Sequence, residues 1–384
     1  MRDALDNKEF AAGIFIDLKK AFDTVEHSIL LHKLRHYGVR GKPFELISSY
    51  LSNRTHSTLI QQTLSKPVEQ KHGVPQGSVL GPLFFIIYIN DLHKAIKNCT
   101  TIHFADDTSL VCRDKSLKKL NTKVNEDLTQ LVHWLRANKI CLNASKTELI
   151  LFKSKFQNTT KKLNFRLSGQ KLELSRTVSY LGVIIDENLD WDAQLSKTAL
   201  KLSRAVGMLS KLRHYLDYKT LLSVYYALFE SHVSYFIQIL GHIKITSLDK
   251  LEKLQNKALR IIHFKGPRES AKPLYVNSRI LPIRYLMKEK NCLLAYDFFK
   301  NRIPKYFSTF LTPLGNNALH ATRNKQLSIT RTKTVMYGSH NICNLVTKDW
   351  NEIHTHLPSL DLITSKPTFK AHLHAYLLTK LATG

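Results

Sequence analysis

The spacing of apolar residues changes near residue 190, and this change predicts two parts with different structure. Before it, short apolar runs such as residues 14–17 and 148–152 have the length and content of buried strands, and residues 178–185 predict a hairpin. Residues 116–139 place leucine and valine three or four positions apart, which predicts an amphipathic helix. From residue 190 onward the spacing is helical.

Two more helices are predicted in the first part. Asp23 or Thr24 can cap a helix that Gly38 ends. A glycine-rich loop at residues 73–82 leads into a second helix at residues 83–89. Because residues 83–89 are apolar on every side, we expect this helix to be fully buried.

Three aspartates lie at the ends of predicted strands. Residues 102–112 form two short apolar runs around Asp106 and Asp107, which predicts a β-hairpin with both aspartates at or beside its turn. Asp17 ends the strand at residues 14–17, far enough along the chain from Asp106 for the two strands to pair in one sheet. An Asp-Asp pair alone is more often only a turn signal, but three carboxylates at one end of a sheet suit Mg²⁺. Two such ions about 4 Å apart are the usual device for in-line phosphoryl transfer.

The helical part carries positive charge opposite its apolar stripes. Residues 195–209 form one such stripe, and residues 248–262 repeat the arrangement. The cations opposite the first stripe are Lys197, Lys201, Arg204 and Lys211. A charged outer face is usual for a surface helix, and two faces that are nearly all positive also suit a wall along a phosphate backbone.

The overall charge favours a polyanionic partner. Among 384 residues, 57 are Lys or Arg and 30 are Asp or Glu, which gives a formal net charge of +27. This excess is unusual for an enzyme of small-molecule metabolism and indicates nucleic acid ahead of an anionic membrane. A hydrophobic content of 43% is ordinary for a globular protein, and the length suits two or three domains.

Cysteine usage and apolar runs argue against a secreted or membrane protein. The five cysteines are scattered without a C-x-x-C pair, so neither a zinc ribbon nor a disulfide framework is indicated. A reducing intracellular setting fits, either the nucleus or the cytoplasm. The chain opens without a signal-peptide pattern. Residues 221–240 are long enough to span a bilayer, but Glu230, His232 and Gln238 interrupt them, so we expect a buried helix and no membrane partner.

Five segments resemble, in this order, motifs A to E of reverse transcriptases, in the form found in jockey- and LINE-like non-LTR retrotransposons. They are FID at residues 15–17 with KAFD at residues 20–23, GVPQGS at residues 73–78, FADD at residues 104–107, LNASKT at residues 142–147, and YLGV at residues 180–183. Five motifs in the right order are far more specific than any one of them. Ala105 also separates the chain from viral RNA polymerases, which carry Gly-Asp-Asp.

The resemblance implies an α+β right-hand polymerase, with a palm made of an antiparallel sheet backed by helices and an α-helical thumb. Residues 1–189 are then expected to form the palm with partial fingers near residues 41–72. Residues 190–265 would form the helical thumb, and residues 266–384 a basic, mainly helical C-terminal region. The implied activity is RNA-directed DNA polymerisation, in which a nucleotide is transferred from a dNTP to a primer 3′-hydroxyl with two Mg²⁺ ions or Mn²⁺ in their place. The implied partners are an RNA template, a DNA primer and dNTPs.

The resemblance also implies roles for individual residues. They are Asp17, Asp106, Asp107 and Lys146 for catalysis, with the aspartates as metal ligands; Phe22, Gln76 and Gly77 for dNTP and template binding; and Tyr180, Leu181 and Gly182 for the primer grip. The four cations at residues 197–211 would contact the nucleic-acid backbone. Lys146 would act on the leaving pyrophosphate. Phe22 matches a steric gate against the ribose 2′-hydroxyl, with plain core packing as the alternative.

The chain departs from the family pattern at its front. Only 16 residues precede Asp17, where the family has a longer fingers segment, and no endonuclease signature is visible. The chain therefore resembles an N-terminally truncated copy, with the missing fingers and endonuclease segment supplied by a longer polypeptide. Three hypotheses compete: an active RNA-directed DNA polymerase, an inactive nucleic-acid-binding remnant, and a template-independent or RNA-making polymerase, which Phe22 argues against.

Overall fold

The chain forms two compact units in a computed structural model that describes residues 1–155, 157, 163–240, 245–314, 326–357 and 363–383. The first unit comprises Met1 and the residues Asp3–Leu189, and the second comprises Arg2 and the residues from Asp190 onward. The first is built of strands and helices, and the second is helical within its described residues. The α+β class expected from the sequence is confirmed.

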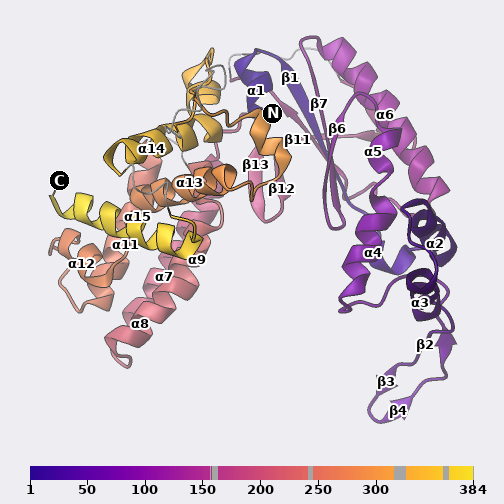
Figure 1. Ribbon diagram of the computed structural model, residues 1–384, viewed down its shortest axis with the longest axis horizontal. Coiled ribbons are helices and arrows are strands. Elements are labelled where there is room, and N and C mark those ends of the chain that lie inside the picture. The colour runs from indigo at the N-terminus through magenta and orange to yellow at the C-terminus, as the bar shows by residue number, and fades with distance from the viewer. Residues whose placement is uncertain (156, 158–162, 241–244, 315–325, 358–362, 384) are drawn as a thin grey trace. The chain divides into compact units, whose positions relative to one another are not determined.

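A five-stranded sheet organises the first unit, with the strand order β11-β8-β1-β7-β6 (Figure 1). Its strands are β1 (Phe10–Ile16), β6 (Thr100–Phe104), β7 (Asp107–Asp114), β8 (Glu148–Phe152) and β11 (Leu174–Ser175). The pairs β8-β1, β1-β7 and β7-β6 are antiparallel, as expected, and β11 adds to β8 in parallel. At Gly13 in β1 a larger residue would not fit, because an added Cβ would stand 2.8 Å from the ring of Phe152.

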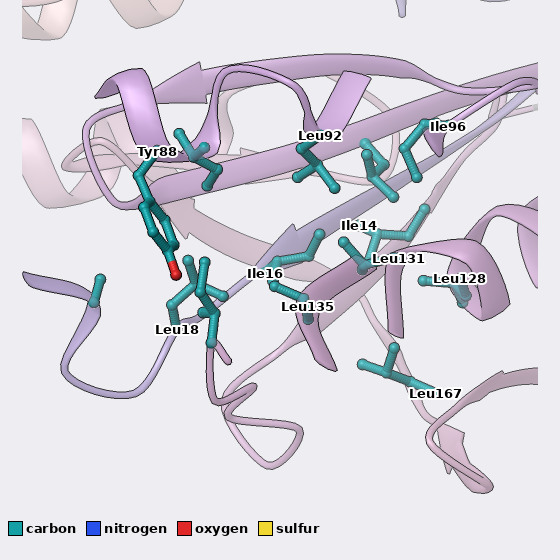
Figure 2. Packing of buried hydrophobic residues seen from close by; sticks show 14 of the residues in the cluster. Ile14, Ile16, Leu18, Tyr88, Leu92, Ile96, Leu128, Leu131, Leu135 and Leu167 are labelled. Carbon is teal, nitrogen blue, oxygen red and sulfur yellow. The ribbon is translucent and has the colours of Figure 1, made fainter. Parts of the chain in front are cut away.

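Helices cover one face of this sheet. The long helix α6 (Leu117–Ala137) contacts β1 and β7 and runs beside the sheet in Figure 1. Its leucines meet the inward side chains of β1, so that Ile14 and Ile16 pack among Leu128, Leu131 and Leu135 (Figure 2). The predicted helix at residues 116–139 and the strand at 148–152 are therefore confirmed. This core fixes the sheet, at whose end the aspartates lie.

The helix expected to start at Asp23 or Thr24 starts later. Residues Ala21–Thr24 form a single 3₁₀ turn, η1, and α2 runs from His27 to His36. The chain between them is extended at Val25, whose carbonyl accepts a hydrogen bond from the N–H of Gly73 at 2.7 Å. This pairing with a distant loop holds the backbone out of the helical conformation. Gly38 follows the helix with a φ of 91°, as its predicted stop requires.

The prediction of a fully buried helix at residues 83–89 is wrong for one of its faces. The helix is α4 (Leu80–Ile89), and Phe84, Phe85 and Tyr88 are buried on the side that packs against α2 and η1. Leu83 and Ile86 are 49% and 50% exposed. Apolar residues all around a helix do not fix which sides are covered, because that depends on how many neighbouring elements reach it.

Substitutions on the two faces of α4 are expected to change the free energy of unfolding by clearly different amounts. Leu83→Ser should change the free energy of unfolding by less than about 0.5 kcal/mol because the side chain is half exposed. Phe85→Ala should cost about 3–5 kcal/mol because it leaves a cavity in the core. Urea titrations followed by circular dichroism measure both values. A large loss from Leu83→Ser would show that a partner in the folded protein covers this face.

The remaining elements of the first unit connect or extend the core. They are α1 (Arg2–Asp6), α3 (Lys42–Leu51), α5 (Leu92–Ala95), β2 (Thr55–His56), β3 (Leu59–Ile60), β4 (Thr63–Leu64), β5 (Val68–Glu69), β9 (Phe165–Leu167), β10 (Gln170–Leu172), β12 (Thr177–Tyr180) and β13 (Val183–Asp186). The short strands β2 to β5 form a ribbon that projects from the first unit (Figure 1). The hairpin predicted at residues 178–185 is β12 with β13.

The second unit is a group of helices. They are α7 (Asp192–Leu212), α8 (Tyr218–Tyr225), η2 (Tyr226–Glu230), α9 (Ser231–Ser234), α10 (Ile237–Leu240), α11 (Ile245–Ile262), α12 (Lys272–Ser278), α13 (Ile283–Phe299), η3 (Lys305–Thr309), η4 (Val335–Ser339), α14 (Ile342–His356) and α15 (Lys366–Thr383). The buried helix expected at residues 221–240 is present as one helical run through α8, the π-helical η2 and α9, and two turn residues separate it from α10. This run buries Leu221, Tyr225, Phe229 and Val233. Within the described residues, no helix combines the length and apolar character that crossing a membrane requires. The division of this unit into a thumb and a basic C-terminal region stays a prediction, and residues 315–325 and 358–362 of that region lie outside the described residues.

Candidate active site

The hairpin of β6 and β7 presents two of the three aspartates. Phe104 pairs with Asp107, so Ala105 and Asp106 are the two central residues of a tight turn, as the sequence predicts. The positive φ of this turn, 53°, falls on Ala105 and not on an aspartate. Asp106 and Asp107 are both exposed. The turn therefore places two carboxylates at the solvent-facing end of the sheet.

Asp17 reaches the same end of the sheet from the neighbouring strand. The last pair between β1 and β7 is Ile16 with Thr108, so Asp17 and Asp107 follow it on adjacent strands. Although Asp107 reaches solvent, the loss of part of its hydration raises its pKa, and the negative charges of Asp106 and Asp17 raise it further. The three carboxylates therefore act on one another electrostatically.

This carboxylate cluster, Asp17, Asp106 and Asp107, has the chemistry of a site for a hard divalent cation. All of its donors are carboxylate oxygens, the ligands that Mg²⁺ prefers, and a cation would relieve the mutual repulsion. Among the residues that the structure describes, no three His, Cys, Asp or Glu side chains are gathered into a ready metal site. The donor set fits the metal, whereas the assignment of the aspartates as ligands stays a prediction.

Asn143 is a neighbour of Asp17 that sequence reasoning missed. Its Nδ2 donates to Oδ2 of Asp17 at 2.6 Å, and its backbone N–H donates to the Asp17 carbonyl at 2.9 Å. Leu142 forms an isolated bridge with Leu18 beside this contact. Asn143 stands in the same motif as Lys146, which is exposed on the following turn. The motif at residues 142–147 was therefore the sequence signal for Asn143, although it assigned a role to Lys146 alone.

The loop at residues 73–82 joins the segment after Asp17. Gln76 is exposed, and its Nε2 donates to Oδ1 of Asp23 at 2.8 Å. Val74 donates its N–H to the carbonyl of Phe22 at 2.8 Å. Gly77 is exposed with a φ of 79°, and a Cβ there would meet nothing within 4 Å. These contacts bring Phe22, Gln76 and Gly77 into one region, while their roles toward dNTP and template stay predictions.

Phe22 is half-buried, and its ring lies 5.0 Å from the ring of Phe85, centroid to centroid. This contact is the core packing that stood as the alternative to a steric gate. The ring is not fully covered, so packing and gating are compatible in this position. Their separation requires the experiment given in the Discussion.

Gly73→Ala is expected to destabilise the first unit. Gly73 has a φ of 85°, and an added Cβ would stand 2.9 Å from the Cα and carbonyl oxygen of Asp23. Because the obstacle is backbone, the loop must move, at a cost of about 2–4 kcal/mol. Thermal unfolding measures the loss. Gly77→Ala is the matched control: it shares the positive φ without the clash and should cost about 1 kcal/mol. Equal losses in the two variants would contradict this account.

The hairpin of β12 and β13 holds Tyr180 against the sheet. Leu181 and Gly182 form its two-residue turn, with φ values of 48° and 78°. The Tyr180 ring lies 4.9 Å from the ring of Phe15, and Ser109 Oγ donates to the Tyr180 hydroxyl at 3.4 Å. Phe15 is two residues before Asp17, and Ser109 is two residues after Asp107. Because strand side chains alternate with period two, Tyr180 covers the face on which Asp17 and Asp107 project.

In the second unit, α7 carries the four cations that are predicted to contact the nucleic-acid backbone. Its apolar stripe is buried at Leu195, Leu202, Val206 and Leu209, as the spacing predicts. Lys201, Arg204 and Lys211 are exposed, and Lys197 is half-buried. These side chains therefore form a positively charged surface on α7. The contact of this surface with nucleic acid stays a prediction.

Residues 2–185 match the family described as reverse transcriptase (RNA-dependent DNA polymerase). The chain is 26% identical over 287 residues to the RNA-directed DNA polymerase from mobile element jockey of Drosophila melanogaster, a match that covers 72% of this chain and 30% of that protein. It is 29% identical over 278 residues to the probable RNA-directed DNA polymerase from transposon BS of the same species, covering 67% of this chain and 30% of that protein. The chain thus spans 30% of the length of these relatives.

Among solved structures, apo telomerase from Candida tropicalis is similar over 95% of this chain and 53% of that chain, at 14% identity. The TM-score of this superposition is 0.38. The reverse transcriptase family implies dependence on a divalent metal in general. The family match covers the carboxylate cluster and the loops that surround it, and the chain therefore carries a reverse transcriptase domain of the type found in jockey- and LINE-like non-LTR retrotransposons.

Proposed function

We propose that this chain contains the catalytic centre of an RNA-directed DNA polymerase that adds dNTPs to the 3′-hydroxyl of a DNA primer. The observation that carries the proposal is the carboxylate cluster: the β6-β7 turn presents Asp106 and Asp107, and Asp17 follows the last β1-β7 pair on the adjacent strand. Carboxylates that repel one another at an exposed strand end are stabilised by cations, and phosphoryl transfer needs cations at the reacting phosphate.

Each residue of the site has a part in this reaction. Asp17, Asp106 and Asp107 would hold two Mg²⁺ ions, or Mn²⁺ in their place. When bound there, the metal would lower the pKa of the primer 3′-hydroxyl and neutralise negative charge on the triphosphate. Gln76, fixed by Asp23, orients the incoming nucleotide, and Phe22 limits space at the ribose. Lys146 gives a proton to the leaving pyrophosphate.

Two sets of residues bind the nucleic acid in this proposal. Tyr180 lies on the aspartate face of the sheet and supports the primer end, with Leu181 and Gly182 shaping its turn. Cations on α7 bind backbone phosphates, which suits a chain with a formal net charge of +27. Segments of the longer relatives that this chain does not span would complete the nucleotide site in a larger polypeptide.

The test is single-nucleotide extension of a DNA primer on an RNA template with Mg²⁺ and labelled dNTP. Extension is expected with the protein and none after addition of EDTA. An Asp106→Asn variant purified in parallel controls for contaminating polymerase. Extension by both proteins, or by neither, contradicts the proposal.

A second candidate is a nucleic-acid-binding protein without catalytic activity. The net charge and the exposed cations of α7 favour it. Its signature is binding of a primer–template duplex that weakens steeply with salt and is not accompanied by extension. The same extension experiment, repeated at several salt concentrations with a binding readout, distinguishes the two functions.

A further inference from the structure

Asn143 connects two residues to which the proposed function gives catalytic roles. Its side chain donates to Oδ2 of Asp17 at 2.6 Å. Its carbonyl oxygen accepts from the backbone N–H groups of Lys146 and Thr147, both at 3.1 Å, and from the Thr147 hydroxyl at 3.0 Å. One residue therefore orients a carboxylate of the cluster with its side chain and the turn that bears Lys146 with its backbone.

The orientation of the Asn143 amide is determined by its neighbours. Ser145 Oγ donates to Oδ1 of Asn143 at 2.9 Å, which leaves the Nδ2 end for Asp17. The backbone leading into Asn143 is also fixed, because Asn143 donates its N–H to the Asp17 carbonyl at 2.9 Å and the Lys19 N–H donates to the Cys141 carbonyl at 2.8 Å. These contacts fix the position of the Asn143 amide independently of its hydrogen bond to the Asp17 carboxylate.

We infer that Asn143 is a positioning residue that holds the Asp17 carboxylate in the rotamer that binds a divalent cation. A carboxylate beside a strand end can rotate, and a fixed donor on one of its oxygens removes that freedom. Hydrogen-bond partners of metal ligands commonly change metal affinity by about 10- to 100-fold. The inference rests on the proposed function in taking Asp17 as a metal ligand.

The first test measures Mn²⁺ binding to the full chain without nucleic acid, by the loss of the free-ion signal in electron paramagnetic resonance. Asn143→Ala and the similarly sized Asn143→Leu should each raise the dissociation constant about 10-fold. Asn125→Ala is the matched control, since that amide donates to the carbonyls of Asn121 and Asn164 and does not touch the cluster. Unchanged Mn²⁺ affinity in both Asn143 variants would overturn the inference.

The second test asks whether metal restores extension. If Asn143 acts through Asp17, raising the Mn²⁺ concentration should recover most of the extension rate of Asn143→Ala, whereas a misfolded variant would not recover. Extension by Asn143→Ala that stays low at every Mn²⁺ concentration, while the thermal unfolding of the variant is unchanged, would assign Asn143 to the turn alone and overturn the inference.

The two tests also separate this inference from the proposed function. Mn²⁺ binding requires no polymerase activity. If the wild-type chain binds Mn²⁺ without extending a primer, and Asn143→Ala weakens that binding, the positioning role stands while the catalytic proposal fails. If the wild-type chain extends a primer and both Asn143 variants bind Mn²⁺ as tightly as it does, the positioning role fails alone.

Discussion

Asp106→Asn is expected to lower the rate of single-nucleotide extension by about 10³-fold, the loss typical of removing one preorganised electrostatic group from a reacting centre. The variant keeps the shape of the turn, because Ala105 and not Asp106 carries the positive φ. It removes one negative charge from the carboxylate cluster. The rate of extension at saturating duplex and dNTP measures the effect.

The same substitution should make the metal-free protein no less stable than the wild type. The charge of Asp106 raises the pKa of Asp107 in the folded state. A carboxyl group with a raised folded-state pKa contributes stability that is present below its unfolded pKa and is lost as the pH rises through the folded pKa. Removing Asp106 lowers the pKa of Asp107, so the stability lost above that pH becomes smaller. Thermal unfolding at pH 7 and pH 4 in EDTA measures this difference.

Asp114→Asn is the matched control for Asp106→Asn. Asp114 ends the same strand, β7, and pairs with Lys123 at 2.8 Å, away from the cluster. Its loss should leave the extension rate unchanged within about twofold, because Asp114 pairs with Phe10 at the end of β7 opposite the cluster. An Asp106→Asn variant that extends as well as Asp114→Asn would show that the cluster is not the reacting centre.

Phe22→Val is expected to lower the preference for dNTPs over ribonucleotides by about 10²-fold, the discrimination that a pocket wall provides against one added hydroxyl. The measurement is the ratio of kcat/KM for the two nucleotides on the same primer and template. Because the Phe22 ring also packs on Phe85, the substitution should cost about 2 kcal/mol of stability, less than for a fully buried phenylalanine.

Stability loss must be separated from loss of selectivity in this experiment. Ile29→Ala serves as the control, since Ile29 is partly buried against the same hydrophobic core. It should destabilise the protein similarly and leave nucleotide selectivity unchanged. If Phe22→Val and Ile29→Ala both lower stability and neither changes selectivity, Phe22 is a packing residue and the steric gate is wrong.

Local patterns determined much of the candidate site. The aspartate hairpin could be predicted because two apolar runs around Asp106 and Asp107 allow few alternatives, and α6 because its leucines repeat at helical spacing. The family resemblance could be stated because its five motifs are short, ordered segments. Each of these features depends on residues near one another in the chain.

Other features depended on contacts between distant segments. The start of α2 was displaced because Gly73 pairs with Val25, and one face of α4 stayed exposed because its neighbours cover only the other. The contact of Asn143 with Asp17 joins residues 126 positions apart. The sequence alone therefore determined the aspartate hairpin, helix α6 and the five ordered motifs of this protein. The tertiary structure decided which faces are covered and which side chain orients Asp17, because burial and hydrogen-bond partners arise only when separate segments pack together.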